Sequence, residues 1–334
     1  MNVLSEALNI VFSRSIIAAI FIPGLVTALL FIILIIWVER KIAARVQMRI
    51  GPLYVTKRFG GILQLIADML RFLVSEPVIP STTDRLIYIL IPILLLLLAL
   101  LPIAVVPASW SLVVIKTKLS LLAFVALTAI SPMVIMIAGW ASNNKFSYIG
   151  GLREGFMLLS YEIYLFVSLL AMTILYGEID FLEIVSSQKV YWGVILNPLA
   201  AVSFFIAMLA STSRFPFEIP DAESEIVMGP FTEYNSIMYG LVMGANYLRL
   251  YSLSLAFSDI FLGGWLLPFN VPLPNFIITM FKTFIVMTIA VFMRAVYPRY
   301  RVDQALVIGW EKLFPLAIIS VLLSVILRYL GVAL

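Results

Sequence analysis

The sequence predicts an all-α integral membrane protein with eight transmembrane helices and one amphipathic helix on the cytoplasmic side. The 334 residues are 63% hydrophobic and only 12% charged, with a mean hydropathy of +1.11. Apolar runs of about 20 residues each recur along the whole chain, and a helix of that length crosses a bilayer. Helices are expected because backbone polar groups inside a membrane must be satisfied within the segment. We therefore expect residues 1–334 to form a single polytopic membrane domain.

The apolar runs predict the positions of the spans, and the basic residues predict their orientation. The spans are expected near residues 16–38, 86–106, 119–141, 155–176, 198–213, 237–257, 276–296 and 313–330. Most of the 22 lysines and arginines fall in the odd-numbered loops. Because loops rich in Lys and Arg stay in the cytoplasm, we expect the odd loops inside and both termini on the outer side. The first apolar run is long enough to span, so no cleavable signal is expected.

The first cytoplasmic loop, residues 39–85, is too long for a simple connection and contains a predicted helix at about 60–74. Gln64, Asp68 and Arg71 follow an i, i+4, i+7 spacing and form a polar stripe on an otherwise apolar helix. One interpretation is an amphipathic helix that lies along the membrane interface. The other is a helix packed against neighbouring spans through a polar seam. Both place Asp68 and Arg71 on one face.

An acidic segment, residues 214–234, stands out in this apolar chain. Its five carboxylates are Glu218, Asp221, Glu223, Glu225 and Glu233. Prolines stiffen it, and apolar residues alternate with the acids, which a solvated connector would not need. Crowded like charges raise one another's pKa values and favour proton exchange near neutral pH. We interpret the segment, which the charge pattern places in the cytoplasm, as the wall of a buried cavity.

Glu162 lies inside the fourth predicted span. A carboxylate at that depth costs a few kcal/mol and normally faces the protein interior. It could relay protons or charge, or it could form a buried ion pair with Arg249 in the sixth span or Lys282 in the seventh.

Composition excludes several kinds of chemistry. The chain has no cysteine and no histidine, which removes thiol chemistry, Fe–S ligands, and the usual haem and zinc ligands. No phosphate-binding glycine motif and no nucleophile–base set is present. We expect no catalytic residue, no metal site and no cofactor bound by this chain, and no nucleic-acid partner.

Motifs in the loops resemble those of a known family. In order along roughly residues 30–315, they are Glu39-Arg40-Lys41, Gln47-Met48-Arg49-Ile50-Gly51-Pro52, Gly61-Ile62-Leu63-Gln64-Leu65-Ile66-Ala67-Asp68, Gly139-Trp140-Ala141-Ser142-Asn143-Asn144, Leu152-Arg153, Ser160-Tyr161-Glu162, the acidic segment, Arg294, Pro298-Arg299-Tyr300-Arg301-Val302-Asp303-Gln304, Trp310 and Pro315. The chain is similar to the membrane subunit of respiratory complex I that lines the quinone tunnel, known as the H subunit in bacteria and as subunit 1 in mitochondria.

The resemblance implies a subunit of a proton-translocating quinone oxidoreductase in a prokaryotic plasma membrane, with no redox cofactor of its own. Quinone would be the substrate, and Fe–S clusters would sit on peripheral-arm partner subunits. The implied tunnel residues are Arg40, Arg49, Gln64, Asp68, Arg294, Arg299, Arg301 and Asp303. The implied proton relay consists of Glu162, Glu218, Asp221, Glu223, Glu225 and Glu233.

The chain departs from the family pattern at three places. Asn246 stands where the family commonly has a membrane glutamate, Glu218 replaces the usual Asp, and Glu311 replaces a usual Lys. The Pro-Asp-Ala-Glu motif at 220–223 also resembles the membrane anchor of energy-converting hydrogenases or sulfur-reducing complexes. Those complexes couple ferredoxin oxidation to ion pumping without quinone. A stand-alone transporter would predict inverted repeats, and the sequence has none.

Overall fold

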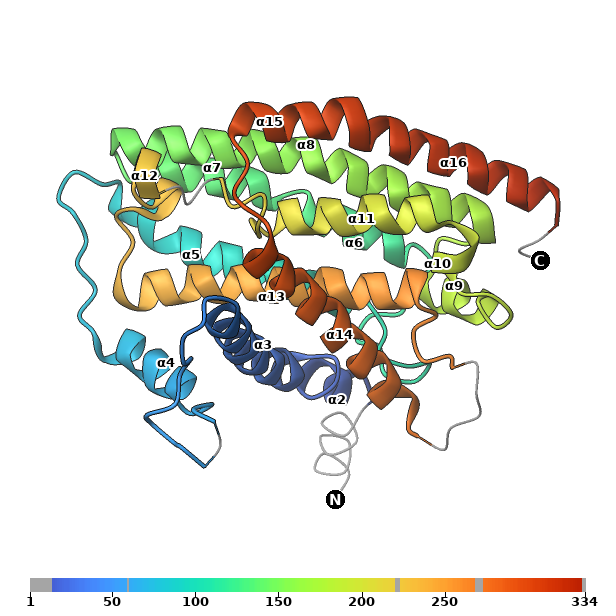
Figure 1. Cartoon of the computed structure of the whole chain (residues 1–334), viewed down its shortest axis with the longest axis horizontal. Coiled ribbons are helices and arrows are strands. Elements are labelled where there is room, and N and C mark those ends of the chain that lie inside the picture. The colour runs from blue at the N-terminus through green and yellow to red at the C-terminus, as the bar shows by residue number, and fades with distance from the viewer. Residues whose placement is uncertain (1–13, 59, 220–222, 268–272, 332–334) are drawn as a thin grey trace, which may run out of the picture.

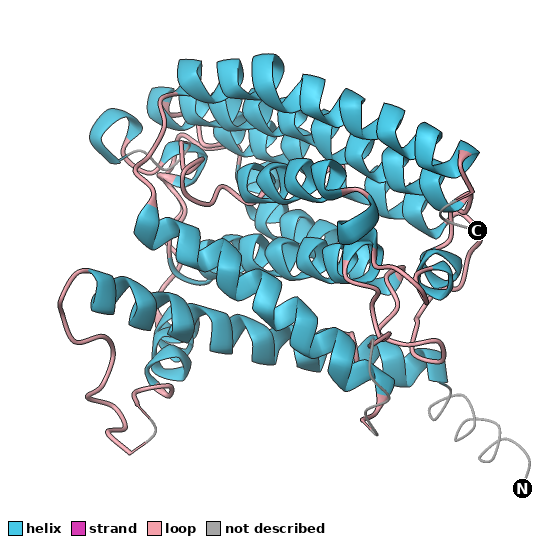
Figure 2. Cartoon of the chain, turned by 45° about the vertical axis from the view of Figure 1, so that its right-hand side comes forward, coloured by secondary structure: helices cyan, strands magenta, loops and turns pink. Residues whose placement is uncertain are grey.

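The computed structural model describes residues 14–58, 60–219, 223–267 and 273–331, and within these ranges the chain folds into helices without a β-sheet (Figure 2). The longer helices are α3 (Leu25–Val46), α4 (Gln64–Val74), α5 (Arg85–Leu100), α7 (Ser131–Ala141), α8 (Lys145–Tyr176), α11 (Pro198–Ser211), α13 (Ser236–Phe261), α14 (Asn275–Val296) and α16 (Phe314–Tyr329). The shorter ones are α2 (Arg14–Ile20), η1 (Leu101–Ala104), α6 (Ser120–Thr128), α9 (Phe181–Ser187), α10 (Gly193–Leu196), α12 (Glu223–Ile226), η2 (Gly229–Phe231), α15 (Val302–Val307) and η3 (Ile308–Leu313).

Six helical stretches in the described ranges are long and apolar enough to cross a membrane. They are Ser15–Val46, Arg85–Ala104, Ser120–Ala141, Lys145–Tyr176, Asn275–Val296 and Val302–Tyr329. These stretches overlap the first four, the seventh and the eighth predicted spans. The prediction of an all-helical membrane protein is therefore confirmed at this level, with six such stretches rather than eight.

The fifth and sixth predicted spans are also helical, but each departs from a simple lipid-facing helix. Helix α11 has 14 residues, which at 1.5 Å per residue gives about 21 Å, short of the roughly 30 Å hydrocarbon layer. Helix α13 has 26 residues and reaches about 39 Å, which is sufficient. Its sequence is less apolar because it contains Asn246, Arg249 and Asp259.

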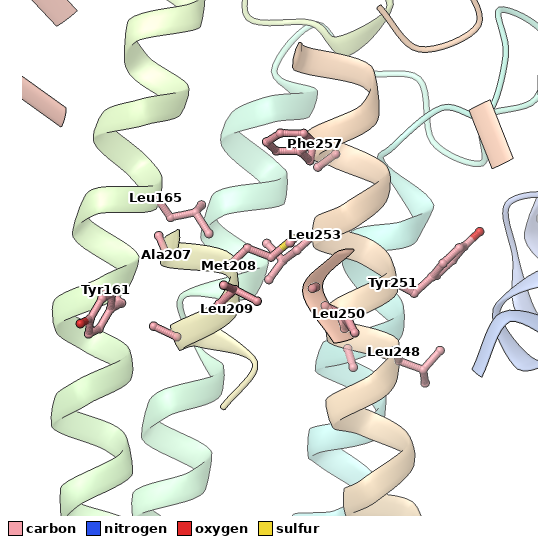
Figure 3. Packing of buried hydrophobic residues seen from close by; sticks show 14 of the residues in the cluster. Tyr161, Leu165, Ala207, Met208, Leu209, Leu248, Leu250, Tyr251, Leu253 and Phe257 are labelled. Carbon is pink, nitrogen blue, oxygen red and sulfur yellow. The ribbon is translucent and has the colours of Figure 1, made fainter. Parts of the chain in front are cut away.

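Helix α13 can carry these polar residues because it is the centre of the molecule. Every residue from Tyr247 to Phe261 is buried. Figure 1 shows α13 in orange between α8, α11 and α16 on one side and α3 on the other, with α14 crossing it. Figure 3 shows side chains of α8, α11 and α13 gathered in the core, while Tyr251 points to the opposite side. There the Tyr251 hydroxyl donates a 2.9 Å hydrogen bond to the Pro23 carbonyl.

Glycine fixes the acidic segment against α8. A Cβ atom on Gly150 would lie 2.6 Å from the Cα of Gly229, a distance too short for two non-bonded carbon atoms. Only glycine therefore allows η2 to pack so closely on the first turns of α8. This contact holds the second half of the acidic segment against the helix that carries Glu162.

Helix α4 begins at Gln64, within the predicted 60–74 range, and packs beside α13 and α3. Its apolar side chains Met69, Leu70, Leu73 and Val74 are exposed. The helix thus presents an apolar face away from the rest of the chain and its polar side chains Gln64 and Asp68 toward each other and α3.

Candidate functional site

Glu39 is a buried carboxylate on α3, at 5% exposure. It shares the inward face of that helix with Ala28 and Ile35, since the three residues stand at i, i+7 and i+11. A carboxylate in such a position must be paired, because an isolated buried charge costs several kcal/mol.

Three residues from separate parts of the chain satisfy Glu39. Arg214, just after α11, donates from Nη1 to both carboxylate oxygens, at 3.2 and 3.1 Å. The Tyr247 hydroxyl of α13 donates at 2.8 Å, and Arg294, in the last turn of α14, forms an ion pair with the same carboxylate. Glu39 thus ties the first span to the central helix, to α14 and to the start of the acidic segment.

Glu218 extends this arrangement. Its carboxylate accepts from Arg299 Nη2 at 3.0 Å and lies 3.6 Å from Arg294 Nη2. The ring of Phe215 lies 5.6 and 5.5 Å from the two guanidinium carbons, within cation–π range. We call the following set the Glu39 cluster: Glu39, Arg214, Glu218, Tyr247, Arg294 and Arg299.

Arg214 keeps its charge inside the cluster. Burial alone would lower the pKa of Arg214, but Tyr247 and Glu39 beside it outweigh that effect and raise the pKa above its ordinary value. The guanidinium also lies 4.1 Å from the ring centre of Tyr247. The cluster therefore holds three guanidinium groups against two carboxylates, a positive balance when all five are ionised.

The residue after Glu39 points to a different partner. Arg40 Nη1 bonds to Asp68 Oδ2 of α4 at 2.6 Å, and Gln64 donates to the other oxygen of Asp68 at 3.2 Å. This pair is partly exposed, at 44% for Arg40 and 32% for Asp68. Consecutive residues of α3 therefore connect α4 on one side and the Glu39 cluster on the other.

Glu162 pairs with Arg249, one of the two partners that the sequence proposed. Arg249 Nη2 donates to Glu162 Oε1 at 2.6 Å, and both side chains are largely buried. Lys282 is engaged elsewhere, because its ammonium donates to the carbonyls of Leu262, Gly264 and Leu266 at 2.6–2.8 Å.

Helix α13 separates the Glu162 pair from the Glu39 cluster. Tyr247 and Arg249 are two residues apart, so they point to different faces of the helix. Tyr247 contacts Glu39 on one face and Arg249 contacts Glu162 on another. The two charge centres are therefore neighbours across a single helix.

The other described acids of the segment have partners on the first turns of α8 or just before it. Glu225 pairs with Arg153 at 2.5 Å, and Asn144 donates to Glu233 at 2.5 Å. Asp221 and the side chain of Glu223 lie outside the described residues. Nearby apolar side chains, including Ile226 and Phe231, are buried, so this part of the segment is packed against the protein.

Some predicted site residues are not brought into the cluster. Arg49 is exposed after the end of α3. Arg301 and Asp303 pair with each other at 3.4 Å, and both are mostly exposed. Among the described residues, no three carboxylates meet in a way that would hold a metal ion.

Sequence reasoning did not place three residues in the site: Glu39, Arg214 and Tyr247. A signal for Glu39 was present, since it falls on the buried α3 face defined by Ala28 and Ile35. Nothing in the sequence alone indicated that Arg214 and Tyr247 would converge on it. A further buried acid, Glu154 of α8, accepts a hydrogen bond from Ser213 at 3.3 Å.

These features define a class of protein, a helical membrane protein with buried ion pairs on either side of its central helix, α13. A model of the NADH dehydrogenase family matches residues 3–325, so the chain belongs to that family. It is 34% identical over 305 residues to the H subunit of the NADH-quinone oxidoreductase of Geobacillus kaustophilus (strain HTA426), covering 91% of each chain. It is 35% identical over 316 residues to the protein of that name in Bacillus cytotoxicus (strain DSM 22905 / CIP 110041 / 391-98 / NVH 391-98), covering 92% of this chain and 94% of the relative. The resemblance drawn from the loop motifs is thereby confirmed.

Proposed function

We propose that the chain is the membrane subunit of a complex I-like oxidoreductase that forms part of the quinone tunnel and couples quinone reduction to proton translocation. The observation that carries the proposal is the junction at Glu39 and Arg40. Arg40 engages Asp68 on α4, whereas Glu39 engages Arg214 of the acidic segment and Tyr247 of the central helix. Because these two contacts are made by adjacent residues of α3, a change of charge at a quinone beside α4 would alter the electrostatic potential at the Glu39 cluster.

In this proposal quinone enters beside α4, whose exposed apolar face suits a helix lying in the membrane interface. Arg40, Gln64 and Asp68 line the entrance, and Arg294 and Arg299 line the inner wall. Arg49, Arg301 and Asp303, exposed in this chain, are assigned to the surface facing peripheral-arm partners. Those partners supply the Fe–S clusters and the electrons, and this chain supplies no redox cofactor.

The relay in this proposal begins at Glu218 and the acids at 221, 223, 225 and 233, and continues to Glu162 across α13. Eight crossings are completed by α13, which is long enough, and by α10 and α11 together. The odd-numbered loops face the cytoplasm of a prokaryotic cell, and the termini lie on the outer side. Co-purification with a nickel-containing hydrogenase instead of quinone-reducing partners would overturn the quinone assignment.

Replacing Asp68 with asparagine is expected to reduce quinone-linked electron transfer while leaving the amount of assembled complex unchanged. The Arg40–Asp68 pair is partly exposed, and such pairs contribute only about 0–1 kcal/mol to stability. A strong effect on turnover without loss of complex would thus identify a role at the quinone. Arg71→Gln, an exposed residue on the same helix, is the matched control. Wild-type turnover in Asp68→Asn would contradict the assignment of α4 to the entrance.

Replacing Glu225 with glutamine is expected to slow quinone-linked turnover without destabilising the complex. Glu225 is 53% exposed in its pair with Arg153, so the loss of the ion pair costs little. Turnover by membranes from the variant, normalised to the amount of complex, tests this. The control is Glu183→Gln on α9, a charged residue outside the acidic segment. Equal turnover in the two variants would mean that position 225 has no part in the relay.

A further inference from the structure

If Glu162 relays protons, Arg249 loses its charged partner each time Glu162 is protonated. The guanidinium is buried, and arginine does not lose its proton in proteins. Whenever Glu162 is protonated, its ion pair with Arg249 is lost and the positive charge remains. An uncompensated buried charge costs several kcal/mol, so Arg249 needs a second source of stabilisation.

A small cavity beside Arg249 can supply this second source of stabilisation. It lies among α5, α7 and α13, and Asn246, Arg249 and Ser252 of α13 line it. Their i, i+3, i+6 spacing places these three side chains on one face of the helix. Thr128, at the end of α6, and Ser131, at the start of α7, complete the polar part of the lining. The volume open to a water-sized sphere is about 20 Å³, and one water needs at least about 10–15 Å³.

The chemistry of the lining fits a single water molecule. Arg249 Nε is buried and has no hydrogen-bond acceptor among the described residues. The hydroxyls of Thr128, Ser131 and Ser252 each donate to a nearby backbone carbonyl at 2.9–3.0 Å, so each oxygen can still accept a hydrogen bond. The Asn246 amide brings both a donor and an acceptor. Buried waters are held by two to four such partners.

We propose that this cavity binds one water molecule, which together with Asn246 solvates the Arg249 guanidinium and keeps it in place when Glu162 is protonated. When a proton binds the Glu162 carboxylate, the ion pair gives way to a neutral acid, and the water and the amide stabilise the remaining positive charge. When the proton leaves, the carboxylate pairs with Arg249 again. Only the proton enters or leaves the site. The functional part rests on the proposed relay role of Glu162, whereas the water site does not.

The direct test is a structure of the intact complex at a resolution that shows buried waters. We expect density for one water within hydrogen-bond distance of Arg249 Nε. A cavity without density, in a map that shows other buried waters of the same chain, would overturn the proposal.

The functional test is Asn246→Leu, which fills the cavity with an apolar side chain. We expect this variant to translocate protons several-fold more slowly per assembled complex than the wild type. Met243→Leu, on the same helix but outside the cavity, is the control and should match the wild type. If the double variant Glu162→Gln/Arg249→Met stops proton translocation but Asn246→Leu does not slow it, the water site has no such role and the relay stands. If the double variant translocates protons at the wild-type rate, the relay itself is wrong.

Discussion

Replacing Glu39 with glutamine is expected to lower the free energy of unfolding by about 3–5 kcal/mol, the usual cost of removing one partner from a buried ion pair. The reason is Arg214, which is 8% exposed and would keep its charge without a carboxylate. Arg294 adds less, because it is 42% exposed and its interaction with Glu39 is screened by solvent. The measurement is the Tm of the purified complex together with the yield of the assembled chain.

Two further variants measure how much the individual partners of Glu39 contribute to stability. Tyr247→Phe removes the hydrogen bond from the hydroxyl to the Glu39 carboxylate and should cost about 1.5–3 kcal/mol. Arg294→Gln should lower the free energy of unfolding less than either, because Arg294 is partly exposed and solvent screens its charge. The expected order of destabilisation is therefore Glu39→Gln, then Tyr247→Phe, then Arg294→Gln. A wild-type Tm for Glu39→Gln would show that the cluster does not hold the three helices together.

The second large effect concerns Glu162 and Arg249, and it should be asymmetric. Glu162→Gln leaves a guanidinium that cannot lose its charge, and the water and Asn246 amide proposed above offset only part of that cost, so the variant should lose up to about 3–5 kcal/mol. Arg249→Met leaves a carboxylate that can take up a proton and become neutral, so it should cost less. The double variant Glu162→Gln/Arg249→Met removes both charges and should recover most of the stability, because buried ion pairs are often replaceable by neutral residues of similar size.

Thermal unfolding of the three variants in one membrane mimetic measures this asymmetry. A double-mutant cycle isolates the coupling between the two side chains. Additive effects, with no recovery in the double variant, would mean that the 2.6 Å contact contributes nothing to stability.

The sequence is sufficient to predict most of the helices. Apolar runs near the spanning length identify a helix whether or not its partners are known, so six predicted spans match helical stretches that could cross a membrane. The same signal is weakest for α13, because the residues of this helix are buried by protein and need not suit lipid. The predicted fifth span runs two residues past Ser211, where α11 ends, because periodicity does not show that the chain there turns toward Arg214.

The candidate site is predictable only in part. Glu162 and Glu218 can be identified because carboxylates in an apolar chain are conspicuous, and Arg249 is one of two partners that the sequence offers. The choice between Arg249 and Lys282 depends on how α13 and α14 are rotated, and periodicity does not fix that rotation. Lys282 instead binds carbonyl groups after the end of α13. Convergence of Arg214 and Tyr247 on Glu39 likewise depends on contacts between residues 175 and 208 positions apart in the chain.

The most direct test of the central claim is the number of protons translocated per quinone reduced, measured in vesicles that contain the complex with the Glu162→Gln/Arg249→Met double variant. This variant removes the titratable carboxylate without leaving a buried charge, so loss of assembly should not confuse the result. If Glu162 relays protons, quinone reduction continues or slows while the ratio falls below that of the wild type. An unchanged ratio at normal turnover would mean that the pair only holds α8 and α13 together, and would contradict the coupling role proposed for this chain.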